Sequence, residues 1–570
     1  YRLNNKIIKN QLYKIPCSLL SNLYLKVQCV PFNNIPFNFS LVNHNPPIAD
    51  LLDCIDSSER THELFARLIK NNTEQRGILY TSKADIVGFK NPEELAEKYN
   101  NVLYHRHQYA RIEIFKNHFY IKEYDENVYE IIYKLKKYAE SGIKNYTHSV
   151  DLWMKNSGLI IDCDEKKNAL RNLFKNSKVA FIYGAAGTGK STMINYISSL
   201  FKDKQKIFLA NTNPAVENLR RKVTAEHAEF VTITKFLSKD VSNDCDILCL
   251  DECSTISNRD MVRVLQRAQC KLLVLVGDIY QIESILFGNW FNIAYKVMPK
   301  DSVAELTRPH RTTVQGLIEV WNKVREITED RLEFITRNGL SSTLDESIFS
   351  RTEEDEIVLC LNYDGIYGIN NINKFLQSNN VNPSINWGVL SYKVGDPVLF
   401  NESNRFAPLV YNNLKGKILQ IEEEEDCIYF TIEVYTVLNE LDVIGFDLEL
   451  KESVTDETSV IRFKVGRGGD GNDDNDNVEN VVPFQVAYAI SIHKAQGLEY
   501  ESVKVLITSE IEEMVSHNIF YTAITRAKSK LKIYWSPETE KRILENMKVQ
   551  FNDKDYQLFK AKYKEALLKS

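Results

Sequence analysis

The feature that most constrains the fold of this chain is a glycine-rich loop between an apolar run and a helical pattern. Residues 184–191 read Gly-Ala-Ala-Gly-Thr-Gly-Lys-Ser, the run 179–183 (Val-Ala-Phe-Ile-Tyr) precedes them, and 192–197 (Thr-Met-Ile-Asn-Tyr-Ile) follow. A phosphate-binding loop requires this strand–loop–helix context. The pattern therefore predicts a parallel α/β domain that holds ATP or GTP at the end of one strand.

Further short apolar runs, separated by helical stretches, extend this pattern along the chain. The first set is 179–183, 206–210, 246–250 and 271–276, and the second is 357–361, 503–507 and 530–535. Apolar runs of this length are typical of parallel strands that are buried on both faces. The sequence therefore predicts two parallel-sheet domains.

The remaining regions have other patterns. Residues 111–122 predict two strands around Lys116-Asn117, and 127–139 predict a helix. Residues 427–435 and 459–465 predict antiparallel strands, and 466–480 is rich in Gly, Asp and Asn, which predicts a surface loop. We therefore expect an N-terminal α+β accessory domain (1–150), a first parallel-sheet domain (151–305), a second one (306–416 and 483–540), a small β insertion (417–482) and a C-terminal helical tail (541–570).

Bulk composition is that of an ordinary globular protein, with 44% hydrophobic and 26% charged residues. The net charge of −6 argues weakly against a nucleic-acid binder, although a groove needs only a local basic lining. The ten cysteines fall mostly in apolar runs, as free thiols do in a reducing cytoplasm. No apolar run reaches about 18 residues, so we expect no membrane span and a cytoplasmic location.

The phosphate loop predicts a nucleotide and magnesium site. Its backbone N–H groups would surround the phosphates, Lys190 would supply a cation, and the Ser191 hydroxyl would bind Mg²⁺. Asp251 and Glu252 end the run 246–250, where the first would bind Mg²⁺ and the second would polarise the attacking water. Gln281, after the run 271–276, could reach the γ-phosphate. The expected nucleotide contacts are Gly184, Ala185, Ala186, Gly187, Thr188, Gly189, Lys190, Ser191 and Thr192.

Two arginines in the second half, Arg311 and Arg526, decide between a simple switch and a motor. An arginine that reaches the developing phosphoryl charge accelerates hydrolysis by roughly 10³–10⁵. If a second domain supplies it, hydrolysis depends on domain closure and is coupled to movement. We therefore expect Lys190, Glu252, Gln281, Arg311 and Arg526 to be the catalytic residues.

Together these segments resemble superfamily 1 helicases, most closely the subgroup B enzymes related to RecD and TraA. The resemblance covers about 160–540. Its strongest parts are Ala487-Tyr-Ala-Ile-Ser-Ile-His-Lys-Ala-Gln-Gly-Leu-Glu-Tyr500 and Asn518-Ile-Phe-Tyr-Thr-Ala-Ile-Thr-Arg-Ala527. Leu306-Thr-Arg-Pro-His-Arg-Thr312 is similar to the segment that carries the family's arginine finger, which matches Arg311. Residues 211–219 and 232–237 resemble two further helicase motifs.

The resemblance implies two RecA-like domains with an SH3-like β insertion at 417–482, and ATP-driven movement 5′ to 3′ on a single strand. Thr212, Thr232 and His493 would contact that strand, together with their neighbours Asn213 and Lys494. Gly497 and Glu499 would lie at the nucleotide. ATP and Mg²⁺ are the implied cofactors, and DNA is favoured over RNA as the track.

Three departures from the family pattern bear on function. Lys166 stands where the family has a glutamine that reads adenine, so GTP could be accepted. Glu283 replaces a proline after Gln281. Only about sixteen residues separate Ala215 from Thr232, which leaves little room for the pin that splits a duplex in related enzymes. The sequence therefore supports translocation better than unwinding.

Several alternatives stay open. The chain could act on RNA or remodel ribonucleoproteins, or it could be a nucleotide-gated interaction module that does not translocate. Residues 1–150 could be a cap, a nucleic-acid clamp, a docking site for a protein partner, or a degenerate nuclease built on Glu113, Glu123 and Asp125. Core packing is the favoured role of Trp290 and Phe291, and base stacking is the alternative.

Overall fold

The computed structural model describes most of the chain from residue 61 to residue 564. The described residues are 14–16, 24–26, 61–74, 76–103, 105–185, 187–238, 243–281, 287–308, 312–388, 390–401, 405–406, 409–466, 480–511, 514–547 and 553–564. Ala186, Glu283, Arg311 and most of the predicted loop 466–480 lie outside them. No helix in the described part of the chain is long and apolar enough to cross a membrane.

The first parallel sheet has six strands in the order β11-β6-β10-β9-β7-β8. Their bounds are β6 Val179–Gly184, β7 Lys206–Ala210, β8 Ala228–Thr232, β9 Asp244–Leu250, β10 Gln269–Gly277 and β11 Val303–Leu306. All its pairings are parallel. The four predicted strands are confirmed, whereas the more exposed β8 and the short β11 have too little apolar character to be predicted.

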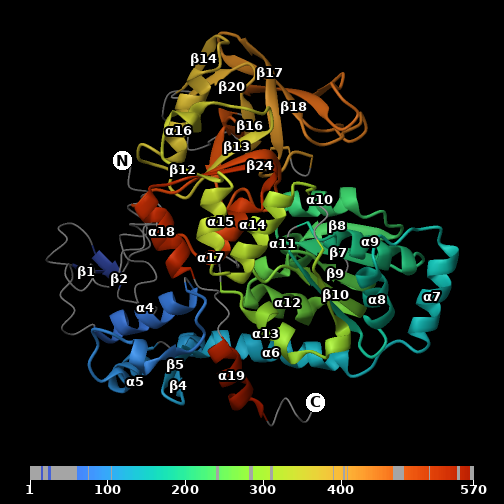
Figure 1. The fold of residues 1–570 in the computed structure, drawn as a ribbon, viewed down its shortest axis with the longest axis vertical. Helices are drawn as coiled ribbons and strands as arrows, with labels where there is room; N and C mark the ends of the chain where they lie inside the picture. Colours follow the sequence, from blue (N-terminus) through green and yellow to red (C-terminus); the bar gives the residue numbers. More distant parts are fainter. Residues whose placement is uncertain are drawn as a thin grey trace.

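Helices cover both faces of this sheet, because alternate strand residues point to opposite sides. One face packs against α7 (Tyr146–Asn156), α8 (Asp164–Asn172) and α9 (Lys190–Leu200). The other packs against α6 (Lys122–Ala139), α11 (Ile233–Leu237), α12 (Asn258–Arg267) and α13 (Trp290–Val297). Helix α10 (Asn213–Lys222) follows β7. The arrangement is a doubly wound α/β layer (Figure 1).

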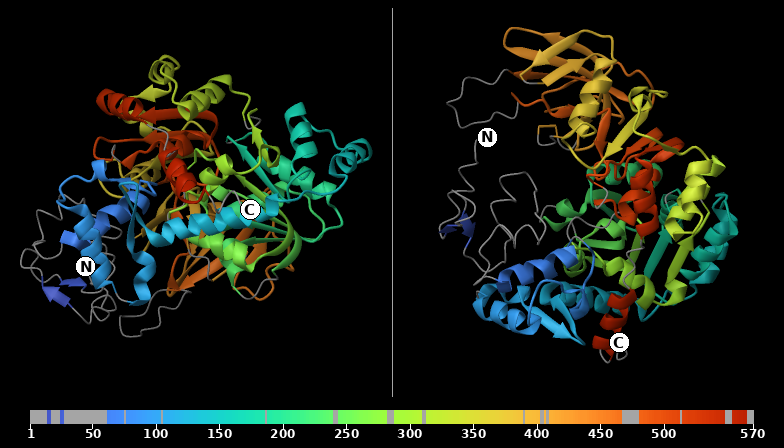
Figure 2. Two further views of the ribbon diagram at one scale, coloured as in Figure 1. Left: turned by 90° about the horizontal axis from the view of Figure 1, so that it is seen from below. Right: turned by 60° about the vertical axis from the view of Figure 1, so that its left-hand side comes forward.

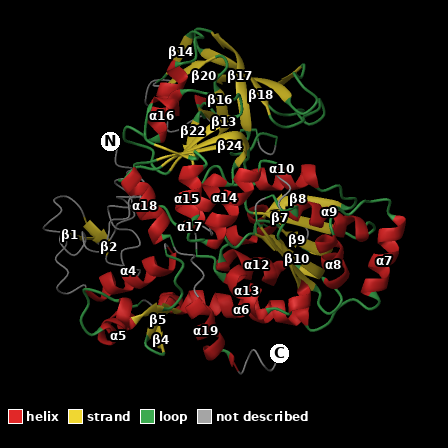
Figure 3. Cartoon of the chain, in the orientation of Figure 1, coloured by secondary structure: helices red, strands yellow, loops and turns green. Residues whose placement is uncertain are grey.

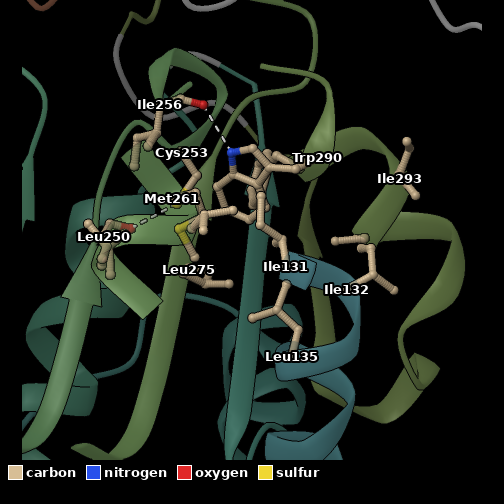
Figure 4. Close-up of a cluster of buried hydrophobic side chains, with 14 of the residues drawn as sticks. Ile131, Ile132, Leu135, Leu250, Cys253, Ile256, Met261, Leu275, Trp290 and Ile293 are labelled. Carbon is tan, nitrogen blue, oxygen red and sulfur yellow. Dashed lines mark hydrogen bonds between the residues drawn. The ribbon is translucent and has the colours of Figure 1, made fainter. Parts of the chain in front are cut away.

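Trp290 and Phe291 belong to this core. Both are buried, and the Trp290 Nε1–H donates to the Ile256 carbonyl at 2.9 Å. Figure 4 shows the indole between strand residues and Ile131 of α6. The prediction of core packing is confirmed, and the alternative of base stacking is wrong.

The second parallel sheet has the order β12-β24-β23-β13-β22. Its strands are β12 Ser341–Ser342, β13 Glu356–Cys360, β22 Ala489–Ser491, β23 Tyr500–Leu506 and β24 Ala527–Tyr534. The helices around it are α14 Gln315–Glu326, α15 Arg331–Arg337, α16 Ile369–Ser378, α17 His517–Ile524 and α18 Pro537–Asn546. The three predicted strands of the second set are confirmed.

An antiparallel sheet lies above the second parallel sheet in Figure 3, in the order β19-β20-β18-β17-β16-β21. Its strands are β16 Pro397–Phe400, β17 Lys415–Glu423, β18 Cys427–Val434, β19 Glu449–Lys451, β20 Ser459–Gly466 and β21 Phe484–Val486, and a hairpin of β14 (Ser384–Trp387) and β15 (Leu390–Lys393) precedes it. This sheet extends beyond both ends of the predicted insertion, 417–482. The strands β16 and β21, which lie outside the predicted range, are only three or four residues long, too short to show alternation.

The N-terminal part of the chain adds a small three-stranded sheet, β3-β5-β4. Its elements are β3 Thr81–Ser82, β4 Ile112–Phe115 and β5 His118–Ile121, with α4 Thr61–Glu74 and α5 Pro92–Val102, and β1 Lys14–Pro16 pairs separately with β2 Tyr24–Lys26. The predicted hairpin is confirmed, because β4 pairs antiparallel with β5, and Lys116 and Asn117 between them have φ of 45° and 60°, as a tight two-residue turn requires. Helix α6 begins at Lys122, earlier than predicted.

The acidic residues of the nuclease alternative form no group in the described part of the chain that could hold a metal. Glu113 accepts a hydrogen bond from the Tyr120 hydroxyl at 2.9 Å, and Asp125 is buried and accepts from Lys562 Nζ at 2.5 Å. A metal-dependent nuclease needs carboxylates that share one cation. The described part of the chain contains no cluster of acidic, histidine or cysteine side chains that could hold a metal. These contacts give Asp125 a structural role.

The C-terminal helix α19 (Asp553–Lys562) packs against this N-terminal layer and α6, at the bottom of Figure 1. The Asp555 carboxylate accepts hydrogen bonds from the backbone N–H groups of Leu79 at 2.7 Å and Tyr80 at 3.0 Å. Phe559 is fully buried in the core that α6 shares with the first sheet. The two ends of the described chain therefore stabilise one another.

We expect Asp555→Asn to loosen this contact. The change removes a buried charge that holds two backbone donors, and such hydrogen bonds contribute about 1.5–3 kcal/mol. Thermal unfolding and hydrogen exchange of residues 76–82 would measure the loss. Asp553→Asn, whose side chain is 77% exposed on the same helix, is the matched control. Equal protection of 76–82 in both variants would contradict the expected role of Asp555.

Candidate functional site

A cavity of about 290 Å³ lies between the first and second parallel sheets and collects most of the predicted nucleotide-site residues. The predicted residues that line it are Gly187, Gly189, Lys190, Ser191, Thr192, Asp251, Glu252, Gln281, Gly497, Glu499 and Arg526. Ala215, Asn218, Leu219, Lys222, Gly277 and Asp278 line it as well and were not predicted. Residues that follow strands of the first sheet and residues that belong to the second sheet therefore line one cleft.

The phosphate loop forms one wall of this cleft. β6 ends at Gly184, and α9 begins at Lys190 with its N-terminus toward the cavity. Gly187 and Gly189 have φ of 78° and 87°, which a residue with a Cβ rarely adopts. A Cβ on Gly184 would lie 2.5 Å from the Thr188 hydroxyl, so a larger residue at position 184 would clash with the loop. Gly184 and Thr188 therefore set the curvature of the phosphate loop although they do not line the cavity.

The loop carries the positive groups that a phosphate chain needs. Lys190 Nζ donates to the carbonyls of Gly184 at 2.8 Å and Ala185 at 3.0 Å, which holds the ammonium against the loop. The backbone N–H groups and the dipole of the α9 N-terminus add to this charge. The loop therefore fits a polyphosphate.

The ends of β9 and β10 supply the acidic and amide groups. Asp251 follows β9 and accepts the Glu252 N–H at 2.9 Å, and Glu252 has a φ of 52°. A non-glycine residue in this left-handed region costs of order 1–3 kcal/mol and is common at functional sites. Burial and the Asp251 charge raise the pKa of Glu252 to about 7, against the opposing effects of Arg526 and Lys190. Glu252 can therefore accept a proton near neutral pH.

The oxygens beside the phosphate loop suit magnesium. A hydroxyl from Ser191 and a carboxylate from Asp251 are hard donors, and Mg²⁺ commonly takes one or two protein ligands together with phosphate oxygens and waters. Burial raises the pKa of Asp251, against the nearby charge of Lys190. Asp278, buried after β10, has an Oδ2 that forms no hydrogen bond with the described part of the chain. The donor set therefore fits Mg²⁺ and a nucleotide.

The second sheet contributes Arg526 and the segment 497–499. Arg526 follows α17 and is 3% exposed, and its guanidinium donates to the carbonyls of Thr522 at 3.0 Å and Leu498 at 3.2 Å. These bonds hold its charge close enough to Glu252 to lower the pKa of that carboxyl. Arg311, the other predicted finger, lies outside the described residues.

Helix α10 connects the two sides of the cleft. Asn218 Nδ2 donates to the Gly497 carbonyl at 2.7 Å, and Lys222 Nζ lies 3.7 Å from Glu499. The two side chains are four residues apart and therefore share one helix face. The sequence signals that could have revealed them are this spacing and, for Asn218, its place in the helicase-like segment 211–219. Neither signal identifies their partners in the second sheet.

The predicted nucleic-acid contacts lie outside the cavity. Thr212 and Thr232 follow β7 and end β8, where their hydroxyls accept from the N–H groups of Ala215 and Lys235. His493 is exposed after β22, and Lys494 Nζ donates to Gln485 at 3.0 Å. They do not form one cluster with the nucleotide residues, and their role stays a prediction.

Lys166 occupies a distinct place. Its side chain is 1% exposed and its Nζ pairs with Asp162 at 2.5 Å. A Cβ on Gly189 would lie 2.5 Å from that Nζ, so Lys166 packs directly on the phosphate loop. If this position contributes to the preference for one nucleotide base, the contacting groups would be the Lys166 ammonium and the Asp162 carboxylate.

Two family models match the chain at the segments that form this cleft. An AAA domain matches residues 163–345, and a UvrD-like helicase C-terminal domain matches 486–534. The first covers the phosphate loop and the ends of β9 and β10. The second covers 497–499 and Arg526.

The curated relatives have low sequence identity to this chain but align over most of its length. An uncharacterized protein of Methanocaldococcus jannaschii is 24% identical over 65% of this chain, which spans only 37% of that protein. The RecBCD enzyme subunit RecD of Buchnera aphidicola from Schizaphis graminum is 23% identical, over 68% of this chain and 78% of the relative. The ATP-dependent DNA helicase Pif1 of Campylobacter jejuni is 23% identical, over 62% and 88%.

Solved structures align more loosely. Bacteroides Pif1 bound to ssDNA is 17% identical over 72% of this chain and 98% of that one, with a TM-score of 0.42. The assignment therefore rests on the sequence comparisons. The two family models and the RecD and Pif1 relatives show that this chain is similar to superfamily 1 helicases of the RecD/Pif1 type.

Proposed function

We propose that this protein is an ATP-dependent DNA helicase or translocase that moves 5′ to 3′ on single-stranded DNA, with ATP and Mg²⁺ as cofactors. The observation that carries the proposal is the composition of the cleft. Lys190, Glu252 and Gln281 come from the first sheet and Arg526 from the second, yet all line one cavity. A site divided in this way is complete only when the two halves meet, which couples hydrolysis to their relative motion.

The domain assignment follows from the same proposal. The first parallel sheet (151–305) and the second (306–416 and 483–540) would be RecA-like motor domains, and the β insertion would be an SH3-like subdomain. Residues 1–150 would form an accessory domain, with protein docking as its proposed role, and 541–570 a helical tail. The contact of α19 with Leu79 and Tyr80 supports a structural link between these terminal parts.

Each side chain has a proposed part in hydrolysis. Ser191 and Asp251 would hold Mg²⁺, which neutralises phosphate charge when bound. Lys190 would bind the β- and γ-phosphates, Glu252 would orient the attacking water and take its proton, and Gln281 would contact the γ-phosphate. Arg526, with Arg311, would stabilise the charge that develops on the transferred phosphoryl group.

The track would cross the outer edge of the cleft. Thr212, Asn213 and Thr232 from the first sheet and His493 and Lys494 from the second are the proposed strand contacts. Single-strand binding of this kind relies on phosphate contacts and is therefore sensitive to salt. The direct connection of α10 to β8, through 223–227, supports translocation more than duplex splitting, because it leaves no room for a pin.

The first test is the ATPase rate without polymer, with single-stranded DNA and with single-stranded RNA, at matched low salt. Strong stimulation by DNA supports the proposal. Stimulation by RNA alone would instead favour an RNA helicase, since the 2′-hydroxyl distinguishes the two polymers. A rate indifferent to both would favour a nucleotide-gated interaction module. Displacement of streptavidin from the 3′ but not the 5′ end of a strand would establish the direction.

We expect Glu252→Gln to bind ATP but to hydrolyse it about 10²–10⁴-fold more slowly, because the amide cannot take the proton of the attacking water. The amide is nearly isosteric, so nucleotide affinity should change little. Fluorescent ATP binding and single-turnover hydrolysis separate the two effects. A turnover number equal to that of the unmodified protein would exclude Glu252 as the water-orienting group.

A further inference from the structure

A second concave surface lies at the opposite end of the first sheet from the nucleotide cleft. A groove of about 610 Å³ opens where the strands begin, beside the last turn of α6. Lys178 precedes β6, Lys204 precedes β7, and Lys271 is near the start of β10. The groove is lined by residues 270–272 of β10 and the cleft by Gly277, so roughly 17–23 Å of strand separates the two.

The groove is basic in a chain that is acidic overall. Lys137, Lys178, Lys204 and Lys271 line it, and Asp246 is the one acidic residue in its lining. The chain as a whole has a net charge of −6. Positive charge is therefore concentrated at this edge of the sheet.

Most of this charge is available to a ligand. Lys271 pairs with Asp246 at 2.7 Å, and its side chain is still 81% exposed. Lys178 and Lys204 are exposed and form no ion pair with any described residue. Unpaired lysines held around a concave surface attract polyanions and bind phosphate groups as point charges.

The floor of the groove is apolar and aromatic. Tyr138, Ile143, Phe201 and Leu272 contribute to the lining, and the Tyr138 hydroxyl is fixed by a hydrogen bond to the Cys270 carbonyl at 3.3 Å. Lysines that alternate with partly exposed rings are the combination that binds single strands without base preference, through phosphate contacts and stacking. An acidic peptide would use the lysines but gain less from the rings.

We propose that this groove, which we call the lysine groove, is a second binding site for single-stranded nucleic acid, separate from the predicted contacts at Thr212, Thr232 and His493. The proposal rests on the proposed function, because it assumes that the protein works on a single strand. The lysine groove would hold a part of the strand that has left the motor or has not yet entered it. Only a strand long enough to pass around the first sheet can occupy both sites.

The test uses Lys178→Glu combined with Lys204→Glu, and single strands of about 8 and about 30 nucleotides, the shorter within the usual site size of one binding fold. We expect the double variant to bind the 30-mer at least tenfold more weakly. Its salt slope should fall by about 1.4, since each lost phosphate contact removes about 0.7 for a single strand. Binding of the 8-mer and the ATPase rate that it stimulates should not change.

The control is Lys90→Glu combined with Lys554→Glu, two exposed lysines of the N-terminal layer and α19 that have no ion pair with any described residue. If Lys178→Glu with Lys204→Glu proves unstable, the corresponding glutamine pair removes the charge without adding repulsion and should show the same salt slope. Equal losses in the two double variants, or an unchanged 30-mer affinity, would overturn the lysine groove and leave the proposed function intact.

Two further outcomes are distinct. In the first, poly-glutamate binds the unmodified protein more tightly than the 30-mer does, and it binds the Lys178→Glu, Lys204→Glu variant more weakly. The lysine groove would then bind an acidic polypeptide, and the proposal would be wrong. If neither oligonucleotide stimulates the ATPase of the unmodified protein, the proposed function itself fails.

Discussion

Replacing Arg526 with alanine should lower strand-stimulated ATP turnover by about 10³-fold while ATP still binds. The expected size follows from the 10³–10⁵ contribution of an arginine that reaches the transferring phosphoryl group. Arg526 is the described cation that the second sheet brings into the cleft lining, so its loss leaves the Lys190 side of the site unchanged. Steady-state ATPase assays with saturating single-stranded DNA, together with nucleotide-binding measurements, would separate the two effects.

Because Arg526 is 3% exposed and donates hydrogen bonds to Thr522 and Leu498, its removal also risks local unfolding. Arg526→Lys controls for this risk, since it retains the charge and much of the volume but not the planar group of donors. We expect the lysine variant to keep the thermal stability of the unmodified protein and still lose most of the stimulated rate. Full activity in Arg526→Lys would show that charge alone suffices and would argue against a finger that contacts two phosphate oxygens.

The part of the site on the first sheet could be predicted because its geometry is local. Lys190, Asp251 and Gln281 each follow a buried apolar run, and the carboxyl ends of neighbouring parallel strands meet at one edge. Once β6, β9 and β10 pair, no further information is needed to bring these side chains together. Arg526 required more, because nothing in its own segment indicates that a residue from the second sheet faces them.

Contacts that depend on docking between distant elements could not be predicted. Asn218 reaches the Gly497 carbonyl across 279 residues, and Asp555 reaches Leu79 across 476. Neither residue has a periodic pattern or a turn signal that depends on its partner. The short strands β16 and β21 present the same difficulty, because pairing within the antiparallel sheet rather than their own sequence makes them strands.

Lys190→Ala should reduce ATP hydrolysis by about 10²–10³-fold or more, with or without a nucleic-acid strand. The ammonium is held against the Gly184 and Ala185 carbonyls, pointing along the phosphate loop, so alanine removes the loop's only side-chain cation. Removal of one preorganised group that stabilises transition-state charge commonly has an effect of this size. ATPase assays over a range of ATP concentrations would show whether the loss falls on turnover, on affinity, or on both.

The comparison of Lys190→Ala with Arg526→Ala tests the division of the site between two sheets. If the cleft is completed by closure, Lys190→Ala should abolish the basal and the stimulated rate alike, whereas Arg526→Ala should mainly remove the stimulation. Ser199→Ala, on the same helix as Lys190 but outside the cleft lining, serves as a control for folding of α9 because it removes a hydroxyl but no charge. Substantial basal turnover in Lys190→Ala would contradict the proposed role of Lys190 in hydrolysis.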